Sequence, residues 1–168
     1  MSTTTKIAEA VAAVGIRRMA ATFTLSAAGL AGLQGHEAVV QKVYRDTTGT
    51  PTVCMGHTGK DVPAIGTRVS YSFCQDLIRQ DTKLYEKVVQ DSVTVPITQE
   101  QYDALVDFTL NVGGPAFRRS QLLKDINLNQ CYPAGAEFMK WTTSKGVVLR
   151  GLYNRRLDER HAWDSGCL

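Results

Sequence analysis

Residues 37 to 59 have the sequence EAVVQKVYRDTTGTPTVCMGHTG and contain two carboxylates, Glu37 and Asp46, nine positions apart. The apolar residues 38 to 40 follow Glu37, so a helical turn here would set its carboxyl against apolar neighbours and raise its pKa. Asp46 lies among hydroxyls, a cation and a turn glycine, which should keep it ionised. One protonated and one ionised carboxyl group form the pair that glycosidic cleavage needs.

A β-hairpin is predicted around Asp46. The run from Thr50 to Met55 favours a β-strand and can return across Asp46 through a turn at Thr48-Gly49. The hydroxyl of Thr52 would then face the same cleft as the two carboxylates. Spacing alone leaves a simpler alternative open, because a Glu and an Asp nine positions apart are most often solvated surface charges.

The order of these residues resembles that of a known family. The pattern Glu-x6-Tyr-x-Asp-x2-Gly-x2-Thr, which begins at Glu37 and is followed by Gly56-His57, is similar to the motif of phage-type lysozymes, glycoside hydrolase family 24. The resemblance implies that Glu37, Asp46 and Thr52 form a catalytic triad. It also implies an α+β fold with a small β-hairpin lobe, a larger helical lobe and the active-site cleft between them.

The resemblance continues outside the motif and covers roughly residues 35 to 164. Residues 95 to 105 with Asn111-Val112-Gly113 are similar to the family's central helix, and residues 151 to 160 are similar to its C-terminal helix. The second of these segments contains Arg155, for which the resemblance implies a supporting role near the catalytic Glu.

Three other positions near the motif carry weaker information. Glycine is usual in the family at two positions that are occupied here by Ala38 and Cys54, although neither change removes a functional group. His57 is a candidate supporting residue. A single histidine after a strand glycine is, however, more often a hydrogen-bonded structural residue than a catalyst.

The length and charge of the chain limit its class. Its 168 residues fit one domain, with a core large enough to be stable without disulfides or other cross-links. A net charge of +3 suits an acidic polymer such as a bacterial wall better than nucleic acid, for which a concentrated basic stripe with aromatic residues is expected. The histidines and cysteines lack metal-ligand spacing, so we expect no metal and no cofactor. We also expect a monomer.

The four cysteines are even in number, which is typical of disulfides if the protein leaves the cytoplasm. Three connectivities are possible, and four buried free thiols are the alternative. For a protein that works in the periplasm, we expect Cys54 to pair with Cys74 and Cys131 with Cys167. The first pair would tie the hairpin lobe to the following helix, and the second would tie two C-terminal helices.

The N-terminal segment, residues 7 to 33, is rich in alanine and glycine and only weakly apolar. As a helix its uninterrupted part, Met19 to Leu33, would be roughly 22 Å long, against about 30 Å for the hydrocarbon core of a bilayer. Such a segment is a poor permanent anchor. It could be a signal peptide cleaved near Ala28 to Gly32, or an amphipathic helix of the soluble fold.

A third interpretation is a signal-arrest-release segment, which inserts in the membrane and later escapes, and the family resemblance favours it. We therefore expect residues 1–34 to form this segment and residues 35–168 to form the catalytic domain. The protein would be tethered and inactive at the host inner membrane, and then released and active in the periplasm.

Hydrophobic periodicity and capping signals predict five helices after the motif. The first is expected to join the two lobes, and Thr98 with Gln101 forms a capping box that opens the second, which ends at Gly113-Gly114. The helices are expected at Ser70 to Val93, from Thr98 to Gly113, at Gln121 to Asn127, at Ala134 to Trp141 and at Leu152 to Trp163. The helical spacing of Trp141 and Trp163 favours core positions over sugar-stacking platforms.

Together these features predict an endolysin that hydrolyses the β-1,4 bond between N-acetylmuramic acid and N-acetylglucosamine in peptidoglycan. Glu37 would protonate the leaving oxygen, Asp46 would activate water or stabilise charge, and Thr52 would orient the attacking water. A non-catalytic wall-binding module and a lytic transglycosylase are the alternatives. Loss of Glu37 or Asp46 would favour the first, and anhydro-sugar products would favour the second.

Overall fold

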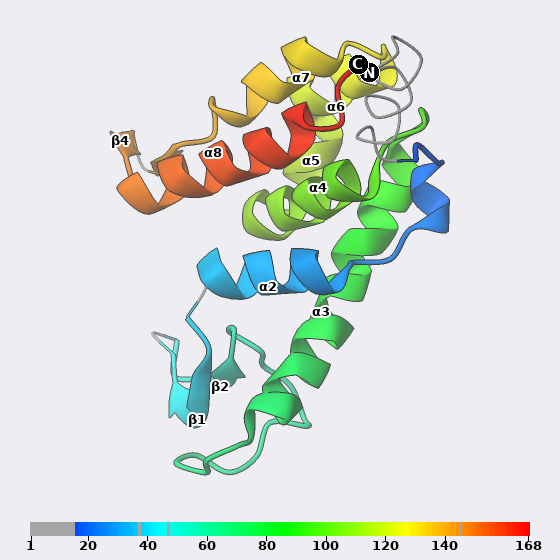
Figure 1. Cartoon of the computed structure of the whole chain (residues 1–168). Coiled ribbons are helices and arrows are strands. Elements are labelled where there is room, and N and C mark those ends of the chain that lie inside the picture. Colours follow the sequence, from blue (N-terminus) through cyan, green and yellow to red (C-terminus); the bar gives the residue numbers. More distant parts are fainter. Residues whose placement is uncertain (1–15, 37, 47, 145) are drawn as a thin grey trace, which may run out of the picture.

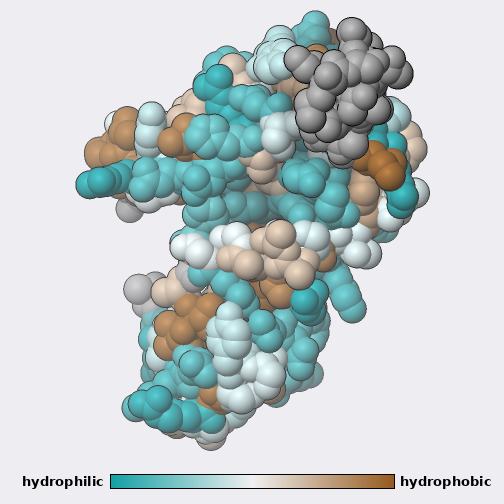
Figure 2. Space-filling view, viewed as in Figure 1, coloured by the Kyte–Doolittle hydropathy of each residue, from teal (hydrophilic) through white to brown (hydrophobic). Residues whose placement is uncertain are grey.

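A long helix, α3 (Tyr71–Ser92), joins two lobes of the molecule (Figure 1). The computed structural model describes residues 16–36, 38–46, 48–144 and 146–168. Ser70 caps α3, because its hydroxyl oxygen accepts a hydrogen bond from the backbone N–H of Phe73 at 3.1 Å. The space-filling view shows the molecule narrowing between the lobes (Figure 2). The connecting helix predicted from Ser70 to Val93 is therefore confirmed, apart from one residue at each end.

The smaller lobe contains an antiparallel hairpin of β1 (Val40–Arg45) and β2 (Pro51–Cys54). Tyr44 pairs with Thr52, and the register is irregular between Val40 and Tyr44. Gly49 in the connecting turn has a φ of 87°, which glycine adopts without steric cost. The hairpin predicted around a turn at Thr48-Gly49 is confirmed.

A small hydrophobic core fastens the hairpin to α3. Val43 and Val53 from the strands are buried against Leu77 of α3. In the same cluster Cys54 is bonded to Cys74, the pair expected from the sequence. The backbone of Cys54 has a φ of 59°, in the left-handed region that favours glycine.

The larger lobe is built around α4 (Gln99–Val112), whose predicted capping box between Thr98 and Gln101 is present. The elements that follow α4 in this lobe are α5 (Gly114–Arg119), α6 (Gln121–Asn127), α7 (Cys131–Phe138), the short strands β3 (Thr143–Ser144) and β4 (Val147–Val148), and α8 (Arg150–Asp164). The bond between Cys131 and Cys167 ties the start of α7 to the end of the chain, as expected.

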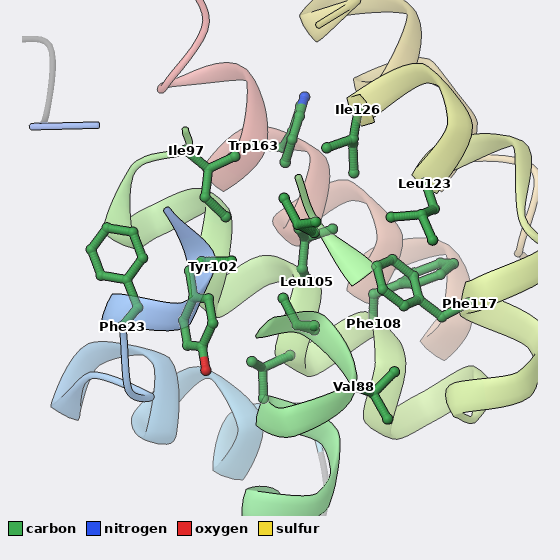
Figure 3. Close-up of a cluster of buried hydrophobic side chains, with 14 of the residues drawn as sticks. Phe23, Val88, Ile97, Tyr102, Leu105, Phe108, Phe117, Leu123, Ile126 and Trp163 are labelled. Carbon is green, nitrogen blue, oxygen red and sulfur yellow. The ribbon is translucent and has the colours of Figure 1, made fainter. Parts of the chain in front are cut away.

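The main core lies where α4 meets the surrounding helices (Figure 3). The ring of Phe108 makes edge contacts with Phe117, Phe138 and Trp141, at centroid distances of 6.3, 5.3 and 5.4 Å. Trp163 is 2% exposed. Both tryptophans therefore contribute to the core, as their spacing predicted.

The N-terminal segment belongs to this core instead of forming one helix. Residues 20 to 22 form a short 3-10 helix, η1 (Ala20–Thr22), residues 23 to 26 have no regular structure, and α2 (Ala27–His36) follows. The continuous helix considered for Met19 to Leu33 is therefore wrong for this state. Five side chains of the segment are buried in the core: Ala20, Phe23, Leu25, Leu30 and Leu33.

Side chains of α3 and α4 explain the break, because they bind the backbone of residues 23 to 26. Gln90 donates to the carbonyl of Phe23 at 2.9 Å, and Gln99 donates to that of Thr24 at 3.0 Å. The N–H of Leu25 donates to Glu86 at 2.8 Å, and that of Ser26 donates to Asp103 at 3.1 Å. Within the described ranges, no helix has the length and apolar character needed to cross a bilayer.

Two predicted helices have different bounds in the structure. The helix expected from Ala134 to Trp141 begins three residues earlier, at Cys131, and ends at Phe138. The last helix begins at Arg150 instead of Leu152. A short hairpin of β3 and β4, with Gly146 at a φ of 79°, lies between α7 and α8.

Candidate active site

The hairpin turn places Asp46 in a dense set of hydrogen bonds. Its Oδ1 accepts from the N–H of Thr48 at 2.8 Å, from the hydroxyl of Thr48 at 2.7 Å and from the N–H of Thr50 at 2.9 Å. The Thr48 hydroxyl most of all, together with the backbone N–H groups of Thr50 and Thr48, lowers the pKa of Asp46. This carboxyl group is therefore ionised at neutral pH.

Thr52 lies two residues beyond Thr50 on β2 and is 3% exposed. Its hydroxyl donates to the carbonyl of Thr50 at 3.0 Å. The backbone N–H of Asp46 donates to that same carbonyl oxygen, also at 3.0 Å. The peptide groups of Thr50 thus connect the two predicted site residues of the hairpin.

Glu37 lies outside the described residues, but both flanking elements are defined. Helix α2 ends at His36, and β1 begins at Val40. A helical turn through residues 38 to 40, considered from the sequence, is therefore wrong. Along the sequence, Glu37 lies between α2 and β1.

Two cavities are lined by neighbouring residues near the end of α4. Leu110 lines one of about 400 Å³, which lies beside the hairpin lobe, and Asn111 lines the other, of about 340 Å³. The larger is also lined by Met55, Gly56, His57, Thr58, Ile78, Asp81, Thr82 and Tyr85. The smaller is also lined by His36, Leu149, Gly151, Leu152 and Arg155. The residue immediately before Glu37 thus shares a cavity with Arg155.

Arg155 is 3% exposed and is held by Asp107 of α4. Its Nη2 donates to Asp107 Oδ1 at 2.5 Å, and its Nε donates to the same oxygen at 3.1 Å. Glu159, one turn further along α8, has Oε1 3.6 Å from the Nε of Arg155. Sequence analysis singled out Arg155 but missed Asp107, although an acid between Val106 and Phe108 in an apolar stretch was a usable signal.

A second ion pair lies behind Arg155. Arg156 is fully buried, and its Nη2 donates to Glu159 Oε1 at 2.5 Å. Burial lowers the pKa of Arg156, and burial raises the pKa of Glu159 well above its ordinary range. The guanidinium of Arg156 also lies 4.8 Å from the ring centroid of Phe108. Both members of this pair lie on α8, so it is the stacking of Arg156 on Phe108 that joins α8 to α4 and supports the position of Arg155.

His57 lies between two carboxylates. Its Nδ1 is 2.9 Å from both oxygens of Asp81 on α3, and its Nε2 is 3.0 Å from Oδ1 of Asp61. Burial lowers the pKa of His57, but the hydrogen bonds with Asp61 and Asp81 outweigh burial and leave the pKa raised. These contacts fasten the residues after β2 to α3, which favours a structural role for His57.

Comparison with known proteins places this geometry in context. Residues 34–159 match the family model described as "Phage lysozyme". The chain is 36% identical over 144 residues to the endolysin of Bacillus phage PZA, a match that covers 84% of this chain and 55% of that protein. It is also 36% identical over 128 residues to the SAR-endolysin of Escherichia phage Mu, covering 76% of this chain and 74% of the relative.

Solved structures show the same architecture. A crystal structure of a P22 lysozyme mutant superposes with a TM-score of 0.79 at 30% identity, over 84% of this chain and 99% of that one. The muramidase domain of SpmX from Asticaccaulis excentricus gives a TM-score of 0.77 at 29% identity, over 83% of this chain and 97% of that domain. The α+β arrangement of a small sheet lobe and a larger helical lobe is confirmed. The chain spans just over half the length of the Bacillus phage PZA endolysin.

Proposed function

Because the chain belongs to the phage lysozyme family, we propose that it is an endolysin that hydrolyses the β-1,4 bond between N-acetylmuramic acid and N-acetylglucosamine in bacterial peptidoglycan. The observation that carries this proposal is the state of Asp46, whose Oδ1 accepts three hydrogen bonds. A carboxylate kept ionised in this way suits the partner of a protonated acid. The proposed acid is Glu37, whose chain neighbour His36 lines the cavity that contains Arg155.

The proposed reaction adds water to the anomeric carbon while Glu37 gives its proton to the leaving glycosidic oxygen. Asp46 takes a proton from the attacking water or stabilises the positive charge on the sugar. Thr52 orients that water. Because the hydroxyl hydrogen of Thr52 is already donated to Thr50, its oxygen can only accept a hydrogen bond from water, which restricts how the water is turned.

Two substitutions test the catalytic roles. Glu37→Gln should abolish lysis of purified cell walls in a turbidity assay, since an amide cannot donate the required proton. Asp46→Asn should reduce lysis nearly as much as Glu37→Gln. Glu100→Gln and Asp76→Asn are matched controls, because both acids are exposed and lie on α4 and α3. Full activity in either site variant would contradict the assignment.

Mass spectrometry of the digested walls separates the alternatives. Hydrolysis leaves reducing muramic acid ends, whereas a lytic transglycosylase would leave anhydro-sugar ends. A non-catalytic binding module would sediment with the walls and release no sugars. We expect reducing ends from the parent protein and none from Glu37→Gln.

We further propose that residues 1–34 act as a signal-arrest-release segment, so that the enzyme is first tethered and inactive at the inner membrane and then active in the periplasm. Relatives at 36% identity are named SAR-endolysins, which supports this proposal. The burial of Phe23, Leu25 and Leu33 in the helical lobe also supports it. While the segment is held in lipid, these side chains cannot at the same time fill the core of the enzyme. A signal peptidase cut near Ala28 to Gly32 would remove part of that core.

Membrane retention can be strengthened without disturbing the docked state. Ala21, Ala27 and Ala31 are exposed in the structure, so leucines there would not crowd the core. Each Leu should favour insertion by roughly half a kcal/mol. We expect the triple variant to stay in the membrane fraction and to lyse cells more slowly than the parent.

Two results would argue against this control mechanism. If the triple Leu variant remained in the membrane yet lysed cells as fast as the parent, insertion would not inactivate the enzyme. If the parent never entered the membrane fraction, residues 1–34 would not be a release segment.

The released enzyme is proposed to act as a monomer without nucleic acid, and sedimentation velocity at working concentration would test this.

A further inference from the structure

Asp107 is a buried acid at the place where α2, α4 and α8 meet. It is 7% exposed and projects from the middle of α4, among side chains that are otherwise mostly apolar. Its Oδ1 accepts two hydrogen bonds from Arg155 of α8, and its backbone carbonyl accepts a longer one, of 3.5 Å, from Nη2 of the same arginine. One side of this carboxylate is therefore committed to Arg155.

The other carboxylate oxygen of Asp107 faces α2. Oδ2 lies 3.6 Å from Nε2 of His36, the last residue of that helix. This separation is longer than a hydrogen bond, so the interaction is electrostatic or bridged by water, and it is an ion pair when the imidazole is protonated. Asp158 of α8 approaches the same nitrogen at 3.8 Å, but its side chain is 65% exposed and more strongly screened.

We propose that Asp107 is a positioning residue: it holds Arg155 with one oxygen, faces His36 with the other, and so fixes the end of α2 from which the chain enters Glu37. This inference rests on the proposed hydrolase activity, because it assigns Asp107 a role in placing the acid of that reaction. The three residues come from three different helices, and the contact to His36 exists only while α2 is docked on α4.

The charges around this junction show why an acid is required at position 107. Arg155 is buried, and the fully buried Arg156 follows it directly. The negative charges are those of Asp107 from α4 and Glu159 from α8, and Glu159 also forms an ion pair with Arg156. Without the charge of Asp107, Arg155 would be less compensated, and its field would favour the ionised form of a nearby carboxyl group.

The test compares Asp107→Asn with Asp125→Asn. Asparagine keeps the shape of the side chain but removes its charge. Asp125 is a matched control, because it is also 7% exposed and lies on a helix of the same lobe, where it accepts a hydrogen bond from Gln121. Both variants are assayed on purified walls well below their unfolding temperatures, with the fold checked by circular dichroism.

For Asp107→Asn we expect kcat to fall about tenfold or more, since a small misplacement of a reacting group is costly. KM should stay within about twofold, because the glycan contacts are unchanged. The pH above which activity falls should move to lower values, since the proposed acid Glu37 would lose its proton more readily. Asp125→Asn should lower the unfolding temperature without moving the pH profile.

His36→Gln gives a second test that leaves the ion pair between Asp107 and Arg155 in place. It removes the imidazole that faces Asp107 from the α2 side, and we expect a loss of kcat with KM retained. A parent-like kcat in either His36→Gln or a folded Asp107→Asn, or an unmoved pH profile in the latter, would overturn the proposal. A parent protein that releases no sugars would instead refute the hydrolase function itself.

Discussion

Cys54 combines a disulfide with a backbone conformation that disfavours every residue except glycine. Its φ of 59° lies in the left-handed region, which costs an L-residue about 1–2 kcal/mol. Its bond to Cys74 closes a separation of 20 residues, for which the chain-entropy model gives about 3 kcal/mol. Two double variants separate these contributions, Cys54→Ala with Cys74→Ala and Cys54→Gly with Cys74→Ala.

The alanine pair loses the cross-link and keeps the backbone strain, so its unfolding free energy should fall by about 3 kcal/mol. The glycine pair also loses the cross-link, but it regains the stability lost to backbone strain at position 54. From that gain about 0.5 kcal/mol is lost, because glycine has greater freedom in the unfolded chain. We expect the glycine pair to be about 1 kcal/mol more stable than the alanine pair. Urea unfolding monitored by circular dichroism measures the unfolding free energies of both double variants. Equal stability, or a more stable alanine pair, would refute the reasoning.

Two further predictions concern the docking of α2 and the pH dependence of stability. A Cβ on Gly29 would lie 2.6 Å from Cγ of Asp103, so Gly29→Ala should lower thermal stability and lysis. A Cβ on Gly32 would meet nothing within 4 Å, so Gly32→Ala should raise the free energy of unfolding by about 0.5–1 kcal/mol. A Gly29→Ala variant as stable and active as the parent would argue against close docking of α2. His57 has a raised pKa, so its stabilisation is present below about pH 6.5 and is lost as pH rises through the folded value. The gap in unfolding free energy between the parent and His57→Asn should therefore be larger at pH 6 than at pH 9, and a gap that does not shrink would contradict this.

Local signals explain which elements could be predicted from the sequence. The capping box at Thr98 and the turn at Gly49 each depend on residues within four positions, and both are in the structure. The break at residues 23 to 26 depends on side chains more than 60 positions away, such as Glu86 and Asp103. No local pattern in the N-terminal segment carries that information, so a continuous helix was the natural expectation.

The site shows the same division. The hydrogen bonds that keep Asp46 ionised come from its own turn, and its state could be predicted from Thr48 and Gly49. The contacts of His57 with Asp81 and of Arg155 with Asp107 could not, because these two acids lie on other helices that pack against the site only in the folded chain. The predicted roles of Glu37, Asp46 and Thr52 stay predictions, since they concern the reaction and Glu37 lies outside the described residues.

The four side chains that hold residues 23 to 26 all bind the main chain of that stretch. Gln90 and Gln99 reach carbonyl oxygens, and the other two accept from N–H groups. Every residue except proline offers the same N–H and C=O groups, so the demand on particular side chains comes from elsewhere: the Ser26 hydroxyl donates to Asp103, and Phe23 and Leu25 are buried in the core. Of positions 23 to 26 only Thr24 is exposed, and its side chain is therefore free to follow a second requirement, such as the solubility in lipid that the proposed release segment would need.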